Sequence, residues 1–247
     1  MGTAQMFSLS RFPAIGFQSA SPISQIGSIA QPTGSPASII RVADDAWSTS
    51  LGPDHLELFN LNINWTTPTS STITGPINLN TIAYNSSLCG FGSSSCIPQP
   101  GTTTKLDPLS DIVMDKVQYR NLGTYESIVC SHICNADGNG RPGVRWYELR
   151  KIGNGSWSIY QQSTYAPDAN GRFMSSITIN STGTIALGYN ISSSSVYPGI
   201  RITGRDSCDA INTMTVAETT IKTGTAANGS TRYGDYNGIV TDPTDDS

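Results

Sequence analysis

The sequence predicts an all-β protein, more specifically a partial β-propeller of four-stranded antiparallel blades. The main observation is a repeat. The phrase Gly-Val-Arg-Trp-Tyr-Glu-Leu-Arg at 143–150 returns about 56 residues later as Gly-Ile-Arg-Ile-Thr-Gly-Arg at 199–205. Propeller blades repeat at this kind of interval, because each blade holds four short strands and their turns. The second observation is composition: only 13% of the residues are charged, and small polar residues suited to strands and turns supply most of the polarity.

The N-terminal part of the chain predicts an irregular start, one incomplete blade and a long loop. Residues 1–37 are rich in Pro, Ser and Gly, so we expect irregular chain with at most one short strand. The predicted second, third and fourth strands of a blade at 38–83 are the apolar runs 38–42, 56–65 and 73–82. Residues 84–108 are expected to form a long loop before the next blade.

Two complete blades are predicted at 110–166 and 172–224. Both contain, in the same order, an apolar strand, the Gly-x-Arg phrase and a strand rich in Thr, Ser or Gln. The first apolar strand alternates: even-numbered residues such as Ile128 and Cys130 share one face, and odd-numbered residues such as Val129 share the other. Such alternation favours a sheet with two distinct faces.

The last segment, 232–247, is predicted to be the innermost strand of a further blade. The predicted propeller therefore covers 38–247, with about two complete blades and two partial ones. A propeller ring needs at least four blades. We therefore expect the chain to be a fragment, associated or only partly folded by itself, whose open strand edges are covered by missing blades or a second copy.

Charge and hydropathy exclude several classes of protein. The net charge of −4 and the sequence pI of about 5.0 leave no basic cluster to neutralise the phosphates of a nucleic acid. No apolar run reaches the roughly 20 residues of a membrane helix, and residues 1–16 lack the pattern of a signal peptide. Residues 138–143 match the Gly-x-Gly-x-x-Gly motif of dinucleotide-binding folds, in which a helix follows the motif. Here a strand is predicted to follow, so the match predicts a turn. We expect no cofactor.

The five cysteines predict one disulfide. Cys89 and Cys96 bracket a Gly/Ser loop that a disulfide would close into a small ring. Cys130 and Cys134 lie on one predicted strand, where their Cα atoms would be roughly 13 Å apart and beyond disulfide reach. One of these two thiols could instead meet Cys208 on an adjacent strand, so the state of these three cysteines stays open.

Two sequence patterns resemble metal sites, and each has a simpler structural explanation. Alternating side-chain oxygens at Asn135, Asp137 and Asn139 resemble the opening of a calcium loop, but the closing acid is missing. A hairpin between two strands accounts for the same residues without an ion. His132 lies between two cysteines, but strand geometry spreads the three side chains apart, which favours packing over metal binding. We expect no metal.

Several phrases resemble an uncharacterised family of large secreted bacterial β-propeller proteins. They include Cys-Ile-Pro-Gln-Pro-Gly-Thr at 96–102, Tyr-Gln-Gln-Ser-Thr-Tyr-Ala-Pro-Asp at 160–168 and Arg-Tyr-Gly-Asp-Tyr at 232–236. The resemblance covers roughly residues 38–246. It implies the C-terminal portion of a propeller and an extracellular or cell-surface location, and it implies no particular activity. We therefore expect a non-enzymatic binding or scaffolding module whose ligand, a protein or a glycan, is held where loops of successive blades meet.

The main enzymatic alternative is a sialidase-like glycoside hydrolase. Such propellers bind a sugar carboxylate through several arginines and use a Tyr/Glu pair and an acid for catalysis. The candidate catalytic residues are Tyr125, Glu126 and Asp235. The candidate binding residues are arginines, at Arg120, Arg145, Arg201, Arg205 and Arg232. Arg145 and Arg201 belong to the repeat, so we expect them at equivalent places, each bonded to a neighbouring blade. Arginines converging near Glu126 would favour the hydrolase.

Overall fold

The computed structural model describes residues 19–90 and 95–246. These residues contain no α-helix and two short 3₁₀ helices, η1 (Thr49–Leu51) and η2 (Pro68–Ser70). The strands are β1 (Ser21–Ile26), β2 (Ala37–Ala43), β3 (His55–Asn62), β4 (Thr72–Asn80), β5 (Val117–Asn121), β6 (Glu126–Asn135), β7 (Pro142–Lys151), β8 (Ser158–Tyr165), β9 (Gly171–Ile179), β10 (Ile185–Ser192), β11 (Gly199–Arg205) and β12 (Val216–Lys222). The predicted all-β class is therefore confirmed.

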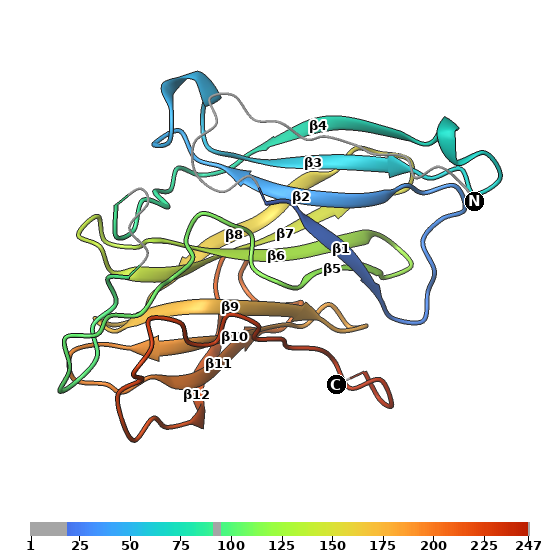
Figure 1. Cartoon of the computed structure of the whole chain (residues 1–247). Helices are drawn as coiled ribbons and strands as arrows, with labels where there is room; N and C mark the ends of the chain where they lie inside the picture. Colours follow the sequence, from blue (N-terminus) through green and yellow to red (C-terminus); the bar gives the residue numbers. More distant parts are fainter. Residues whose placement is uncertain (1–18, 91–94, 247) are drawn as a thin grey trace.

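The strands follow one another as three antiparallel four-stranded meanders, β1–β4, β5–β8 and β9–β12. Parallel pairing of β1 with β5, from Ile23 opposite Val117 to Ile26 opposite Arg120, joins the first two meanders into one eight-stranded sheet. That sheet curls until β4 approaches β8, and the third meander forms a separate sheet beside β6 and β7 (Figure 1). The repeated Gly-x-Arg phrases lie in β7 and β11, the third strand of their meanders.

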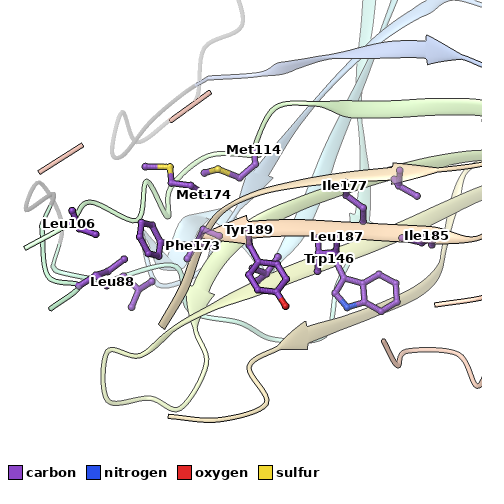
Figure 2. Packing of buried hydrophobic residues seen from close by; sticks show 14 of the residues in the cluster. Leu88, Leu106, Met114, Trp146, Phe173, Met174, Ile177, Ile185, Leu187 and Tyr189 are labelled. Atoms are coloured by element: carbon purple, nitrogen blue, oxygen red, sulfur yellow. The ribbon is translucent and has the colours of Figure 1, made fainter. Parts of the chain in front are cut away.

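Two apolar cores hold these layers together. The inter-sheet core lies between the eight-stranded and four-stranded sheets and includes Trp146, Phe173 and Leu187 (Figure 2). The curled-sheet core lies inside the curl of the eight-stranded sheet, and its members are Ile40, Val42, Trp47, Leu56, Leu58, Leu79, Val113, Val117, Tyr119, Ile128, Cys130, Tyr147 and Leu149. As the alternation predicted, β6 sends Val129 to the first core and Ile128 to the second. It is therefore buried on both faces.

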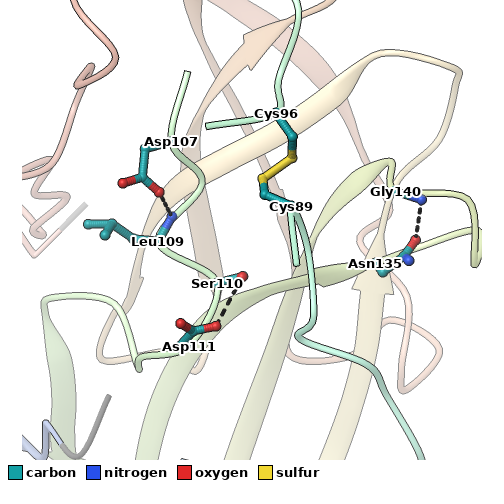
Figure 3. Close-up of a disulfide and its surroundings, with 8 residues drawn as sticks. All are labelled: Cys89, Cys96, Asp107, Leu109, Ser110, Asp111, Asn135 and Gly140. Atoms are coloured by element: carbon teal, nitrogen blue, oxygen red, sulfur yellow. Dashed lines mark hydrogen bonds between the residues drawn. A yellow bond between two sulfur atoms is a disulfide. The ribbon is translucent and has the colours of Figure 1, made fainter. Parts of the chain in front are cut away.

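The connection between β4 and β5 closes one end of the inter-sheet core. Its apolar residues Leu88, Ile97 and Leu106 belong to that core, and a backbone bridge pairs Ile97 with Leu106. The predicted Cys89–Cys96 disulfide is confirmed and lies against the same core (Figure 3). The described residues of this long connection therefore contribute to packing, although they form no strand of the sheets.

The strand predicted for the last segment is not formed. Residues 232–246 do not form an innermost strand: Gly234, at φ 80°, begins a turn in which Asn237 N–H donates to its carbonyl. Side chains rather than a ladder then fix the segment, since Asn237 donates to Met174 O and Gln118 to Ile239 O, both at 2.9 Å. Of the three cysteines whose state the sequence leaves open, Cys208 is exposed and free. Cys130 and Cys134 are buried free thiols.

The irregular N-terminal segment can be assessed only in part. Its described portion contains β1, which agrees with the expectation of one short strand at most. Residues 1–18, like residues 91–94 and Ser247, lie outside the described residues. The described part of the chain holds no helix long and apolar enough to cross a bilayer.

Candidate functional site

A cavity opens where β1 and β2 separate. These strands pair only at Ser21 with Ile40 and Pro22 with Ile39. Beyond that point β1 follows β5, whereas β2 continues along β3, so the two halves of the sheet diverge. The divergence leaves a wedge-shaped cavity of about 570 Å³ at the end of the curled-sheet core. We call it the wedge cavity, and its volume lies within the range of small-molecule sites.

One wall of the wedge cavity comes from β1, β5, β6 and the β7–β8 hairpin. Strand register places Gln25 opposite Tyr119, and Glu126 opposite Lys151. Trp157 follows in the hairpin, with its ring centroid 6.3 Å from that of Tyr119 in an edge-to-face arrangement. These five side chains line the cavity together. They come from separate strands, and cross-strand register brings them side by side.

The opposite wall comes from β2, β3, β4 and the connection between β1 and β2. Ser38, Asn60 and Ile77 continue the inward-facing rows of these strands past the last core leucines. The Ser38 hydroxyl donates to Oδ1 of Asn60 at 2.9 Å, which orients the amide. The connection adds Gln31 to the lining. The inward face thus changes from apolar to polar at the point where water can enter.

A buried polar cluster lies at the floor of the wedge cavity. The Tyr119 hydroxyl donates to Oε2 of Glu126 at 2.7 Å, and Nζ of Lys151 lies 2.8 Å from Oε1. Lys151 also lies 5.3 Å from the centre of the Trp157 ring. Burial, together with the bond to Glu126, raises the pKa of Tyr119 above its usual range. Tyr119 therefore remains a protonated donor, and Lys151 balances the charge of Glu126.

Of the candidate catalytic residues, only Glu126 lines the wedge cavity. Tyr125 instead stacks on Arg150, whose guanidinium carbon lies 4.0 Å from the centre of its ring. Asp235 lies in the C-terminal segment and accepts a 2.7 Å hydrogen bond from Arg232. The structure therefore separates the three candidates. The tyrosine that contacts Glu126 is Tyr119, which the sequence did not single out.

The candidate arginines do not converge. Arg120 binds the Asp246 carboxylate, and Arg205 donates to carbonyls of the loop after its own strand. Arg145 donates at 3.1 Å to Ile82 O, which lies in the connection after β4 and not in a strand of the preceding meander. Arg201, at the equivalent place in β11, instead lies 3.8 Å from Glu218 of its own sheet. Arg232, like the other four, is absent from the described lining of the wedge cavity.

The calcium candidates form a hairpin loop between β6 and β7. Oδ1 of Asn135 accepts from Gly140 N–H at 2.9 Å (Figure 3), and Oδ1 of Asp137 accepts from Asn139 N–H. The bond from Asn139 lowers the pKa of Asp137, and the Arg141 guanidinium lies 3.3 Å from the other carboxylate oxygen of Asp137. The loop oxygens thus serve hydrogen bonds within the turn, as the hairpin interpretation requires.

Two further clusters of possible metal ligands form hydrogen bonds with other groups of the protein. Nε2 of His132 is hydrogen-bonded with the Tyr147 hydroxyl at 2.9 Å, and burial lowers its pKa to about 3, so the ring is neutral. Within the described residues, only Asp44, Asp45 and Asp54 offer three ligand atoms close together. The two buried carboxylates of this group accept backbone N–H donors, including those of Ala46 and Tyr84.

Sequence reasoning missed most of the wedge cavity. Lys151 and Trp157 end one strand and precede the next, so neither stands out in a chain rich in short polar turns. One sequence signal for Lys151 is the predicted pairing of β6 with β7, since this hairpin places Lys151 directly opposite Glu126.

Comparison of the chain with protein-family models, curated proteins and solved structures found no match. The site therefore rests on its own geometry.

Proposed function

We propose that this protein is a non-enzymatic binding module of partial β-propeller architecture, belonging to an extracellular or cell-surface bacterial protein, and that the wedge cavity is its ligand site. The observation that carries the proposal is the cavity itself. It combines a half-buried indole, Trp157, with oriented polar groups from several strands, at the end of an apolar core. A concave site with an apolar lining and a few fixed polar groups is typical of small-ligand binding.

The order of the strands supports the propeller interpretation. Three consecutive four-stranded meanders have their first strands close together, with β5 beside both β1 and β9. First strands of successive blades line the axis in a propeller. The parallel pairing of β1 with β5 departs from a ring of separate blades. The Cys89–Cys96 disulfide supports an oxidising location such as the cell exterior.

The polar cluster supports binding rather than hydrolysis. A tyrosine nucleophile needs a phenol that loses its proton readily, whereas burial and Glu126 raise the pKa of Tyr119. Both oxygens of Glu126 already have partners, Tyr119 and Lys151. No arginine is present in the described lining to bind a sugar carboxylate. These groups therefore fix one another in place and leave no general acid or base in evidence.

The sialidase-like alternative has one observation in its favour, the Tyr119–Glu126 hydrogen bond inside a cavity. A direct assay separates the two functions. Incubation with 4-methylumbelliferyl glycosides, including the N-acetylneuraminic acid conjugate, is expected to release no fluorophore above the buffer rate. Release of the fluorophore that is lost in Tyr119→Phe would contradict the binding module and support a hydrolase.

The ligand site is tested by binding without an assumed ligand class. Saturation-transfer NMR with a mixed library of small neutral, acidic and basic compounds is expected to give hits that disappear in Trp157→Ala. Trp65→Ala is the matched control, because Trp65 is 85% exposed and lies outside the described lining of the cavity. Hits that persist in Trp157→Ala, or an absence of hits, would contradict the proposed site.

A further inference from the structure

We infer that the wedge cavity binds an uncharged saccharide, with one sugar ring placed against Trp157. This inference rests on the proposed function of the cavity as a ligand site and names the class of ligand. A pyranose ring has an apolar C–H face and a rim of hydroxyl groups that donate and accept hydrogen bonds. The lining offers the matching surfaces, an indole that is only partly covered by protein and a ring of short polar side chains.

The polar side chains of the cavity suit hydroxyl groups. Gln25, Gln31 and Asn60 are amides, and each carries both a donor and an acceptor. Because Oδ1 of Asn60 already accepts from Ser38, the amide nitrogen of Asn60 is the group of this side chain left to donate to a ligand. Hydroxyl groups can satisfy such mixed donors and acceptors, whereas a purely apolar ligand would leave them unpaired.

The charges of the cavity argue for a neutral ligand. Its described lining contains one cation and one anion, Lys151 and Glu126, and they form an ion pair with 2.8 Å between Nζ and Oε1. The two side chains are largely buried, at 19% and 6% exposed. An acidic sugar would have to draw Lys151 away, and an amino sugar would have to draw Glu126 away. Separating a largely buried pair is costly, so a neutral ligand is favoured.

The ion pair can nevertheless contact a neutral sugar. Lys151 has three N–H donors, and Glu126 has lone pairs beyond those used by its two partners. Hydroxyl groups that bond to these charged atoms make charge-assisted hydrogen bonds, which are stronger than neutral ones. The pair thus fixes the orientation of the sugar without selecting a charge.

The shape of the cavity argues against a peptide strand. A peptide that extended the sheet would need to run between β1 and β2. At one end of the wedge these strands are already paired, through Ser21 with Ile40 and Pro22 with Ile39. At the other end the connection from β1 to β2 joins them covalently, and Asn121 anchors it through a 2.8 Å bond to Ala30 O. The space between the strands therefore suits a compact ligand.

Binding measurements on the whole chain test this inference. The neutral probes are the methyl glycosides of glucose, galactose, mannose and N-acetylglucosamine, together with cellobiose, lactose and chitobiose. The charged probes are methyl glucuronide, N-acetylneuraminic acid and glucosamine, and the peptide probes are uncharged tetrapeptides. We expect saturation transfer to at least one neutral saccharide, stronger than to any charged or peptide probe.

Variants identify the contact. Trp157→Ala is expected to weaken neutral-saccharide binding at least 10-fold, and Trp65→Ala to leave it unchanged. Because Trp157 packs on the curled-sheet core, thermal melting accompanies each measurement. Gln25→Ala changes an exposed residue that leaves the core intact, and the loss of one hydrogen bond is expected to weaken binding about 5-fold.

The outcomes separate the ligand class from the site. Charged or peptide probes that bind in place of neutral saccharides and are lost in Trp157→Ala would overturn the ligand class and keep the site. Neutral-saccharide binding that is unchanged in both Trp157→Ala and Gln25→Ala would overturn the inference and the proposed function together. An absence of binding by every probe would do the same.

Discussion

The two apolar cores share β6 and β7 but end differently. The inter-sheet core is sealed by the connection between β4 and β5, which supplies Leu88 and the half-buried Cys89–Cys96 disulfide. Within residues 19–90 and 95–246, no such plug covers the curled-sheet core where β1 and β2 diverge, and the core opens there into the wedge cavity. A tryptophan in each marks the contrast: Trp146 is fully buried, whereas Trp157 is half-buried. The sealed core therefore contributes to stability alone, whereas we propose that the open end of the other core binds a ligand.

The largest expected effect separates the two tryptophans by stability. Trp146→Ala would leave a cavity in the sealed inter-sheet core and is expected to lower the free energy of unfolding by about 3–5 kcal/mol. Trp157→Ala removes a half-buried ring at an open edge and is expected to cost less than about 2 kcal/mol. Urea denaturation of both variants measures the difference. Equal losses of unfolding free energy in the two variants would contradict the distinction between a sealed and an open core.

Removal of the disulfide tests the seal of the inter-sheet core. The bridge spans a sequence separation of 7. Its loss in the double variant Cys89→Ser, Cys96→Ser is expected to lower the free energy of unfolding by about 2–3 kcal/mol. Binding at the wedge cavity should not change, because no cysteine lies in its described lining. Cys208→Ser is the control, since that thiol is exposed and free. A double variant with lost binding and unchanged stability would reverse the assignment.

A pH effect is expected from His132, on the face of β6 that carries the curled-sheet core. Burial, reinforced by Arg145, lowers its pKa to about 3, and in the unfolded chain the pKa is about 6.5. Between these values the unfolded state binds more protons, so stability is full above about pH 6.5 and decreases as the pH falls. We expect the unfolding free energy to fall by about 1.4 kcal/mol per pH unit in this window beyond that of His132→Gln. Identical pH slopes for the two proteins would contradict a buried neutral imidazole.

The smallest effect concerns the tie between the two sheets. Asp246 binds Arg120 of β5 and accepts from Ser181 N–H after β9 at 2.7 Å, and the Arg120 bond lowers its pKa below the usual range. Asp246 is partly exposed, so Asp246→Asn is expected to cost less than about 1 kcal/mol. Hydrogen exchange in 237–246 should increase while exchange in β6 stays constant. Faster exchange throughout β6 would mean that this contact supports the cores themselves.

Local sequence patterns predicted most strands, because residues that alternate along a strand lie on opposite faces of the sheet. The alternation of Ile128 and Val129 assigned the two faces of β6 correctly. The error at 232–246 has a local and a distant cause. Gly234 bends the chain, and a strand also needs a neighbouring edge to pair with, which no local pattern reports.

The wedge cavity depends on strand pairing between distant parts of the chain, which local sequence patterns do not predict. It exists because β1 pairs with β5 about ninety residues away, at Ile23 with Val117, and leaves β2 after two residue pairs. The sequence predicts Glu126 as a candidate on chemical grounds, with the adjacent Tyr125 as its partner. Tyr125 precedes β6 and packs against Arg150, and the tyrosine that donates to Glu126 is Tyr119, one strand away.

The central claim is that the open end of the curled-sheet core binds a ligand, and the indole N–H signals test it most directly. The chain has four tryptophans, in distinct environments: Trp47 and Trp146 are buried, Trp65 is 85% exposed, and Trp157 lines the wedge cavity. In ¹⁵N-labelled protein titrated with the neutral saccharide that binds best, we predict that the Trp157 signal shifts in a saturable way and that the signals of Trp65 and Trp146 do not. A saturable shift of Trp65 with an unmoved Trp157 would contradict the account.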